Sequence, residues 1–225
     1  MRMYAALVPP PPVLEDLAAV VRSVRGSEAE LDPVPAERMH LPLGNFGNVG
    51  LTDRLALKET LTDEVARWGP MELRFHGGSA LREPGDDSVW AELAGDIEQL
   101  RAMGTVLPRV VHRLGFLIDR RLFQTRVRVG RITGATGLGY LERLLSRLDG
   151  YSGPAWNAHH VSLVRLSTEG TADPELQVLH ELRLVGDADG TGDTGAAGGR
   201  HRGGDDADGR PKAAAEHTDE RADSA

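Results

Sequence analysis

Two spacings of hydrophobic residues divide the first 186 residues into segments. Apolar residues two apart predict strands, and apolar residues three or four apart predict helices that bury one side. The strand pattern covers residues 3–8, 39–47, 71–76, 88–93, 123–131, 156–166 and 176–185. The helix pattern covers residues 13–26, 51–68, 96–114 and 140–148. Strand, helix, strand and helix, in two successive rounds, predict an α+β fold of two similar lobes.

The end of the chain has a different composition. Residues 187–225 contain no valine, isoleucine, leucine, methionine or aromatic residue. A segment of this kind buries too little apolar surface to offset the entropy lost on ordering, which predicts a disordered tail. The sequence therefore predicts one folded domain over residues 1–186, a length that can bury a full core.

The net charge of −8 is also unevenly divided. Ten acidic residues and five lysines or arginines in residues 187–225 account for −5, so the predicted domain carries only −3. A mildly acidic domain has no overall positive field that would attract nucleic acid. Any anion-binding site must therefore be local.

Several functional classes are excluded or disfavoured by composition. The chain contains no cysteine, which excludes disulfides, thiol catalysis and thiolate metal sites. No apolar run reaches the length of a membrane span, and the amino terminus lacks a signal-peptide pattern. Neither His112 nor His180 has a metal-ligand partner at a plausible spacing. We therefore expect a cytoplasmic protein that does not contact the membrane. We also expect a monomer without a metal or other cofactor.

Two of the predicted strands carry the candidate site residues. In residues 39–47, the polar His40 points to the face opposite two apolar leucines. In residues 123–131, two valines share one face, and Arg126 and Arg128 share the other. We interpret the two polar faces as the walls of one groove, with a histidine on one wall and two cations on the other.

These stretches resemble the bacterial RNA 2',3'-cyclic phosphodiesterases, also called 2'-5' RNA ligases, of the two-histidine phosphoesterase superfamily. The resemblance rests on segments that follow one another in a family-like order: residues 1–7, 40–47, 123–131, 156–167 and 182–185. It implies two pseudo-symmetric lobes of antiparallel sheet and helices that flank a central groove. It also implies a reaction without metal, in which a 2',3'-cyclic phosphate is opened to a 2'-phosphate.

The motifs of that family are only partly present. Its members carry His-x-Thr or His-x-Ser once per lobe, which places an imidazole and a hydroxyl side by side on a strand. The resemblance makes His40 the first histidine, the general acid, but Pro42 stands at the hydroxyl position. In the second motif, Arg126 replaces the histidine and Arg128 replaces the hydroxyl residue. Arginine stays protonated and cannot act as a general base, although it binds phosphate well.

A second His-x-Ser pair, His160 and Ser162, competes with Arg126 for the second-motif position. In the family, a helix and two strands follow the second motif. The chain after Arg126 supplies them, whereas only one short predicted strand follows His160. The pair is therefore a candidate backup for the missing histidine, and the alternative is a surface histidine on an ordinary strand.

The resemblance implies a hydrolase that opens a 2',3'-cyclic phosphate on an RNA end or a small nucleotide. His40 would donate the proton, and Arg126 and Arg128 would hold the phosphate. Loss of one of two cooperating proton-transfer groups lowers a rate about 10²- to 10⁴-fold, so an impaired enzyme is expected. The alternative is an inactive relative that binds an RNA end or a nucleotide phosphate, and the sequence leaves both open.

Overall fold

The computed structural model describes residues 2–25, 30–81, 85–116, 123–167 and 175–186. These ranges all belong to one unit of the chain, Met1–Gly190. The predicted tail lies outside the described residues, so its disorder and the domain end at residue 186 stay predictions. Within the described ranges, no helix has the length and hydrophobicity that a membrane span requires.

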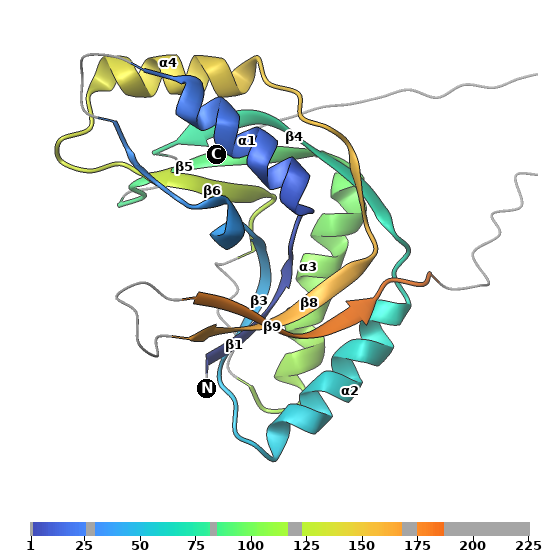
Figure 1. The fold of residues 1–225 in the computed structure, drawn as a ribbon. Helices are drawn as coiled ribbons and strands as arrows, with labels where there is room; N and C mark the ends of the chain where they lie inside the picture. Colours follow the sequence, from blue (N-terminus) through green and yellow to red (C-terminus); the bar gives the residue numbers. More distant parts are fainter. Residues whose placement is uncertain (1, 26–29, 82–84, 117–122, 168–174, 187–225) are drawn as a thin grey trace, which may run out of the picture. The chain divides into compact units, whose positions relative to one another are not determined.

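The first lobe is built on a four-stranded antiparallel sheet in the order β3-β1-β8-β9 (Figure 1). Its strands are β1 (Arg2–Leu7), β3 (Leu41–Asn48), β8 (His160–Ser167) and β9 (Glu175–Arg183). The helices α2 (Asp53–Ala66) and α3 (Ile97–His112) pack together against this sheet. Along β1, Met3, Ala5 and Leu7 belong to the main core, whereas Tyr4 and Ala6 form a small cluster with Val164 on the opposite face.

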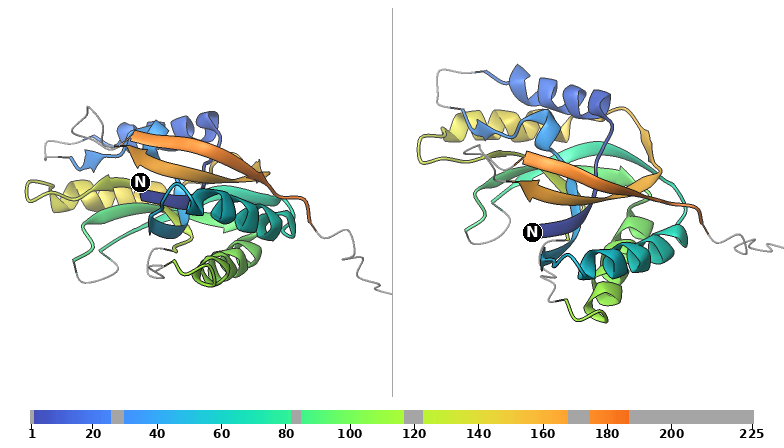
Figure 2. Two further views of the ribbon diagram at one scale, coloured as in Figure 1. Left: turned by 90° about the horizontal axis from the view of Figure 1, so that it is seen from below. Right: turned by 60° about the horizontal axis from the view of Figure 1, so that its bottom comes forward.

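The second lobe is built on a five-stranded antiparallel sheet in the order β2-β6-β5-β4-β7. Its strands are β2 (Asp32–Pro33), β4 (Met71–Ala80), β5 (Ser88–Gly95), β6 (Arg126–Arg131) and β7 (Trp156–Ala158). The helices α1 (Pro11–Ser23) and α4 (Leu138–Asp149) lie side by side on this lobe, as the views in Figure 2 also show. A short 3-10 turn, η1 (Ala36–Arg38), leads from β2 to the first lobe. The two-lobed α+β fold expected from the sequence is confirmed.

Close packing fixes the segment that leads into β6. Gly104 of α3 is buried beneath the ring of Phe123, and a side-chain carbon at that glycine would overlap the ring. The ring therefore lies directly on the helix backbone, which only glycine permits. Because Phe123 comes shortly before Arg126, this contact helps to set where β6 begins and which way its side chains face.

One sequence prediction about the strands is wrong. Residues 156–166 were expected to form a single strand, but they form β7 and β8 in different sheets. β7 pairs with β4, and β8 pairs with β1 after the chain crosses between the sheets at His159. The carbonyl of His159 accepts a hydrogen bond from the amide of Leu184 at 2.8 Å, which satisfies the backbone at the crossing. The prediction failed because no glycine or proline marks this crossing.

Tyr151 links the segment after α4 to α1. Its hydroxyl donates a hydrogen bond to Oδ2 of Asp16 at 2.6 Å, and burial with this contact raises the pKa of the phenol. We expect Tyr151→Phe to lower the free energy of unfolding by about 1–2 kcal/mol, because a hydrogen bond to a charged acceptor is lost. Thermal unfolding measures this loss, and Asp16→Asn, which keeps an acceptor, should cost less. An unchanged melting temperature in Tyr151→Phe would show that the bond contributes nothing.

Candidate active site

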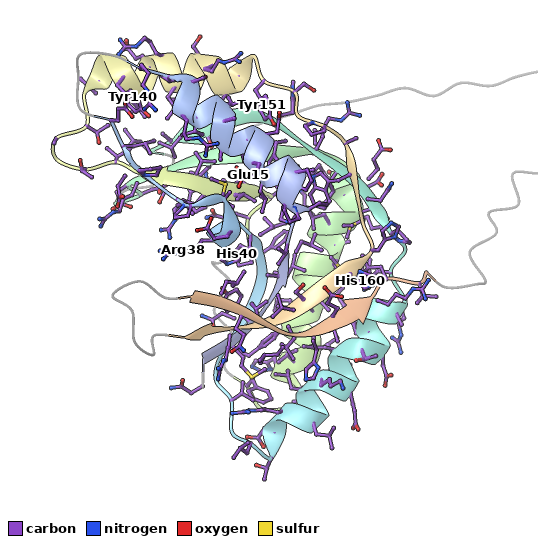
Figure 3. All side chains as sticks on the ribbon, viewed as in Figure 1. Glu15, Arg38, His40, Tyr140, Tyr151 and His160 are labelled. Carbon is purple, nitrogen blue, oxygen red and sulfur yellow. The ribbon has the colours of Figure 1, made fainter. Side chains whose placement is uncertain are left out.

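His40 lies between η1 and β3, one residue before the strand begins (Figure 3). Its Nδ1 is 2.7 Å from the carbonyl oxygen of Arg38, and its Nε2 is 3.1 Å from the hydroxyl of Tyr4. A carbonyl oxygen only accepts hydrogen bonds, so Nδ1 carries the hydrogen. In a neutral imidazole Nε2 is then an acceptor, and the Tyr4 hydroxyl donates to it. Both ring nitrogens are therefore held by the protein.

The surroundings of His40 favour the neutral imidazole. Burial lowers the pKa of His40 from its ordinary value of 6.5, and the positive charge of Arg128 lowers it further. The hydrogen bond to the carbonyl of Arg38 raises the pKa by less than burial lowers it, and the effect of Arg128 is the smallest of the three. At neutral pH the resting His40 therefore has a lone pair at Nε2, which is the form of a proton acceptor. The role of general acid that the resemblance implies requires this histidine to gain a proton first.

Arg128 comes to the site from the other lobe. It lies on β6 directly opposite Trp90 of β5, and its side chain is exposed. Among the described residues, no hydrogen bond or ion pair holds its guanidinium group. Its charge nevertheless lies close enough to His40 to lower the pKa of the imidazole. A neutral histidine of the first lobe and an exposed arginine of the second are thus near enough to interact electrostatically.

Arg126, two residues earlier on β6, is held within the second lobe. Its guanidinium carbon lies 4.5 Å from the centre of the Trp90 ring, and its Nε donates to Oε1 of Gln124 at 2.7 Å. Oδ2 of Asp86 lies 3.9 Å from the Arg126 guanidinium and accepts from the indole of Trp90 at 3.0 Å. The Arg126 and Asp86 side chains are only 11% and 12% exposed. Much of the charge that was expected to hold a phosphate is therefore balanced by Asp86.

His160 and Ser162 lie on β8, away from His40 (Figure 3). Ser162 is opposite Ala6 of β1, and Ala6 is opposite Pro42 of β3, so these residues share one face of the first sheet. With β1 between them, Ser162 and Pro42 are two strand spacings apart, roughly 10 Å. His160 is exposed and Ser162 is buried. No described contact joins this pair to His40, and its role as a backup stays a prediction.

A cavity of about 510 Å³ opens beside Arg126. It lies between the approach to β6, the end of β5 and one side of α3, and its walls are largely polar. The residues that line it are Glu92, Arg101, Thr105, Phe123, Gln124, Thr125 and Arg126. A cavity of this size admits part of a small-molecule ligand. Within the described ranges, no three histidine, aspartate or glutamate side chains gather in a way that could hold a metal ion.

Three residues at the site were not found by sequence reasoning: Tyr4, Asp86 and Trp90. Tyr4 was read only as part of a buried strand, although it stands out of phase with the apolar residues that face the core. Asp86 lies between two predicted strands, and Trp90 lies within the second of them. The alternation of β5 places Trp90 on the same face as Arg126 and Arg128, and that spacing was the one signal available.

A scan against models of known protein families finds no match for this sequence, and a search of curated proteins finds none. Solved structures do match. TT0787 of Thermus thermophilus aligns with a TM-score of 0.58 and 22% identity over 83% of this chain and all of that chain. LigT of E. coli, in complex with 3'-AMP, aligns with a TM-score of 0.64 and 18% identity over 81% of this chain and 97% of LigT. The chain has the LigT fold.

LigT belongs to the 2'-5' RNA ligase family, so the fold that the sequence resemblance implied is confirmed. A further structure, described as a phosphoesterase, aligns with a TM-score of 0.58 and 17% identity over 81% of this chain and 98% of its own. Other structures of LigT contain phosphate, NADP+ or ATP. Structural alignments at 17–22% identity establish the fold of this chain but not its chemistry, which depends on its own residues.

Proposed function

We propose that this chain binds the phosphate of a nucleotide or an RNA end between its two lobes, with little or no hydrolysis. Arg128 supplies the charge that holds the phosphate, and His40 supplies a neutral imidazole beside it. The preferred ligand carries a 2',3'-cyclic phosphate or the monophosphate formed when that ring opens. The observation that carries this proposal is the approach of the exposed Arg128 to His40 from the opposite lobe.

Phosphate binding fits the charges at this site. Arg128 is exposed, and a guanidinium group offers paired donors that match two phosphate oxygens. Binding of an anion to a cation without a carboxylate partner is also more favourable, because no existing ion pair has to be broken. Solved structures of LigT contain phosphate, 3'-AMP or ATP, which supports a nucleotide phosphate as the ligand here.

Efficient hydrolysis needs a second proton-transfer group, and the strand that faces His40 supplies arginines instead. Arginine remains charged at any working pH, so neither Arg126 nor Arg128 can take up or release a proton during the reaction. Pro42 also removes the hydroxyl that the resemblance places next to the first histidine. These changes leave the charge that binds phosphate. They remove the groups that would catalyse hydrolysis of the bound phosphate ester.

Slow opening of a 2',3'-cyclic phosphate is the second candidate, and the neutral form of His40 favours it. Nε2 would accept a proton from a water molecule while the water oxygen forms a bond to phosphorus. The bond from phosphorus to the 3'-oxygen would break, and that oxygen would take a proton from solvent. The product is a 2'-phosphate. Without a second histidine, the rate should be about 10²- to 10⁴-fold lower than with a complete pair.

Titration calorimetry and a turnover assay on the full chain distinguish these candidates. We expect saturable binding of 3'-AMP that weakens at higher salt, because the contact is charged. Turnover of a nucleoside 2',3'-cyclic monophosphate should be near the uncatalysed level. His40→Ala and His160→Ala test the two histidines in the same assays.

The results separate the alternatives. Rapid turnover that His40→Ala abolishes would replace the binding proposal by the hydrolase. Rapid turnover that depends on His160 would move the chemistry to the second His-x-Ser pair. If the full chain binds neither 3'-AMP nor inorganic phosphate, the site proposed here is wrong.

A further inference from the structure

The hydroxyl of Tyr4 lies beside His40, on the strand next to Pro42. Pro42 lies opposite Ala6 of β1, and Tyr4 is two residues from Ala6 on the same face of the sheet. From there its hydroxyl extends to within 3.1 Å of Nε2 of His40. An aromatic hydroxyl thus lies next to the histidine whose motif partner, Pro42, has no hydroxyl.

We propose that the Tyr4 hydroxyl is the phosphate-binding hydroxyl of this site and takes the role that Pro42 cannot fill. This inference rests on the proposed function, because it assigns a further residue to the same phosphate site. The donor comes from the neighbouring strand rather than from the motif itself. Tyr4 therefore contacts the ligand as Arg128 does.

The ring of Tyr4 is held in place, which makes its hydroxyl a preorganised donor. Tyr4 is 6% exposed and packs in the cluster with Ala6 and Val164. Its ring centre is 5.3 Å from that of His40, with 32° between the ring planes. Burial raises the pKa of the Tyr4 phenol, so the hydroxyl keeps its hydrogen at any working pH. A fixed, protonated phenol loses little entropy when it binds a ligand.

A phosphate at Arg128 would give this hydroxyl a better acceptor than it has in the free protein. Without ligand, the hydroxyl donates to the neutral Nε2 of His40. A phosphate oxygen is charged, and hydrogen bonds to charged acceptors are stronger. When Tyr4 turns its hydrogen to the phosphate, Nε2 of His40 is released to the ligand or to a water molecule. The same movement thus holds the phosphate and frees the imidazole.

Binding of 3'-AMP to the full chain, followed by titration calorimetry, tests the role of Tyr4. Tyr4→Phe should weaken binding about tenfold, because one hydrogen bond to a charged group is lost. The matched control is Tyr151→Phe, which also removes one phenol hydroxyl but acts at the contact with Asp16, on the other lobe (Figure 3). That control should bind 3'-AMP as the natural chain does, even though its stability is lower.

Rescue by a second substitution separates a ligand contact from a structural role. Pro42→Ser places a hydroxyl at the motif position, on β3 at the edge of the sheet, where a change at proline is tolerated. In the Tyr4→Phe background, Pro42→Ser should recover most of the lost affinity. In the natural background it should change affinity less than about threefold, because the Tyr4 hydroxyl already fills this role.

The outcomes distinguish this inference from the proposed function. If the natural chain binds no phosphate ligand, the proposed function fails and Tyr4 has no ligand to hold. If the natural chain binds 3'-AMP and folded Tyr4→Phe binds it equally well, only the inference about Tyr4 is overturned. If Tyr4→Phe does not fold, Pro42→Ser alone decides: a tenfold gain in affinity would show that the hydroxyl role was vacant, and an unchanged affinity supports Tyr4.

Discussion

Replacing Arg128 by glutamine should weaken the binding of 3'-AMP about ten- to 100-fold, because a charge-assisted contact to phosphate is lost. Glutamine keeps a polar side chain of similar reach but removes the charge. The exposed side chain of Arg128 has no ion pair to break among the described residues, so the free energy of unfolding should hardly change. Titration calorimetry measures the affinity, and the dependence of affinity on salt should become weaker in the variant.

Arg131→Gln is the matched control for this prediction. Arg131 is exposed at the other end of the same strand, and its guanidinium pairs with Asp32 at 3.4 Å. Its loss lowers the net charge of the chain by the same amount but leaves His40 and Arg128 in place. Equal losses of affinity in Arg128→Gln and Arg131→Gln would mean that the general field of the lobe binds the ligand. The assignment of Arg128 to a local site would then be wrong.

Arg126 and Arg128 of β6 show how far sequence alone can assign a role. The alternation of the strand correctly predicted that both would lie on the face opposite two buried valines. The sequence could not separate them, because their difference lies in partners about 40 residues away. Asp86 and Trp90 surround Arg126 and leave Arg128 exposed. Such contacts depend on how β5 pairs with β6, and no local pattern encodes that register.

The fold itself was largely predictable, and its failures have clear causes. Helices such as α1 and α3 have long apolar stripes, and the spacing of the apolar residues identifies these segments as helices. β2 falls outside the strands predicted from the sequence, because a two-residue strand that contains Pro33 has no pattern of its own. It is defined only by its pairing with β6. The split between β7 and β8 was missed for the same reason, since the pairing partner and not the local sequence decides it.

Strand alternation predicted that His40 and Arg128 would face one groove, but it did not predict the effect of Arg128 on the pKa of His40. The resemblance implied that His40 is the general acid, a role that requires the charged imidazole. Burial lowers the pKa of His40 most, and the charge of Arg128, which comes from the other lobe, lowers it further. Arg128 therefore adds to the effect of burial, which is the main cause that favours the neutral imidazole.

This state of His40 leads to the second large effect that we expect, a gain of turnover in Arg126→His combined with Arg128→Thr. A histidine at position 126 would stand beside Asp86, whose carboxylate favours the charged form of an imidazole. His40 would remain neutral, and loss of the Arg128 charge would not reverse the effect of burial. One imidazole would then be poised to accept a proton and the other to donate one. Turnover of a nucleoside 2',3'-cyclic monophosphate should rise about 100-fold or more over the natural chain.

The gain must depend on both imidazoles if this reasoning is right. His40→Ala in the same background should return turnover to the level of the natural chain, whereas Arg131→His, which adds an imidazole elsewhere on β6, should gain nothing. Loss of Arg126 leaves Asp86 bonded to the indole of Trp90 at 3.0 Å and to the amide of Ser88 at 3.0 Å, so the carboxylate stays in place. A folded variant that binds 3'-AMP but shows no gain would mean that position 126 does not face the phosphate. In that case the natural chain did not lose catalysis through Arg126, because a histidine at that position could not have reached the substrate.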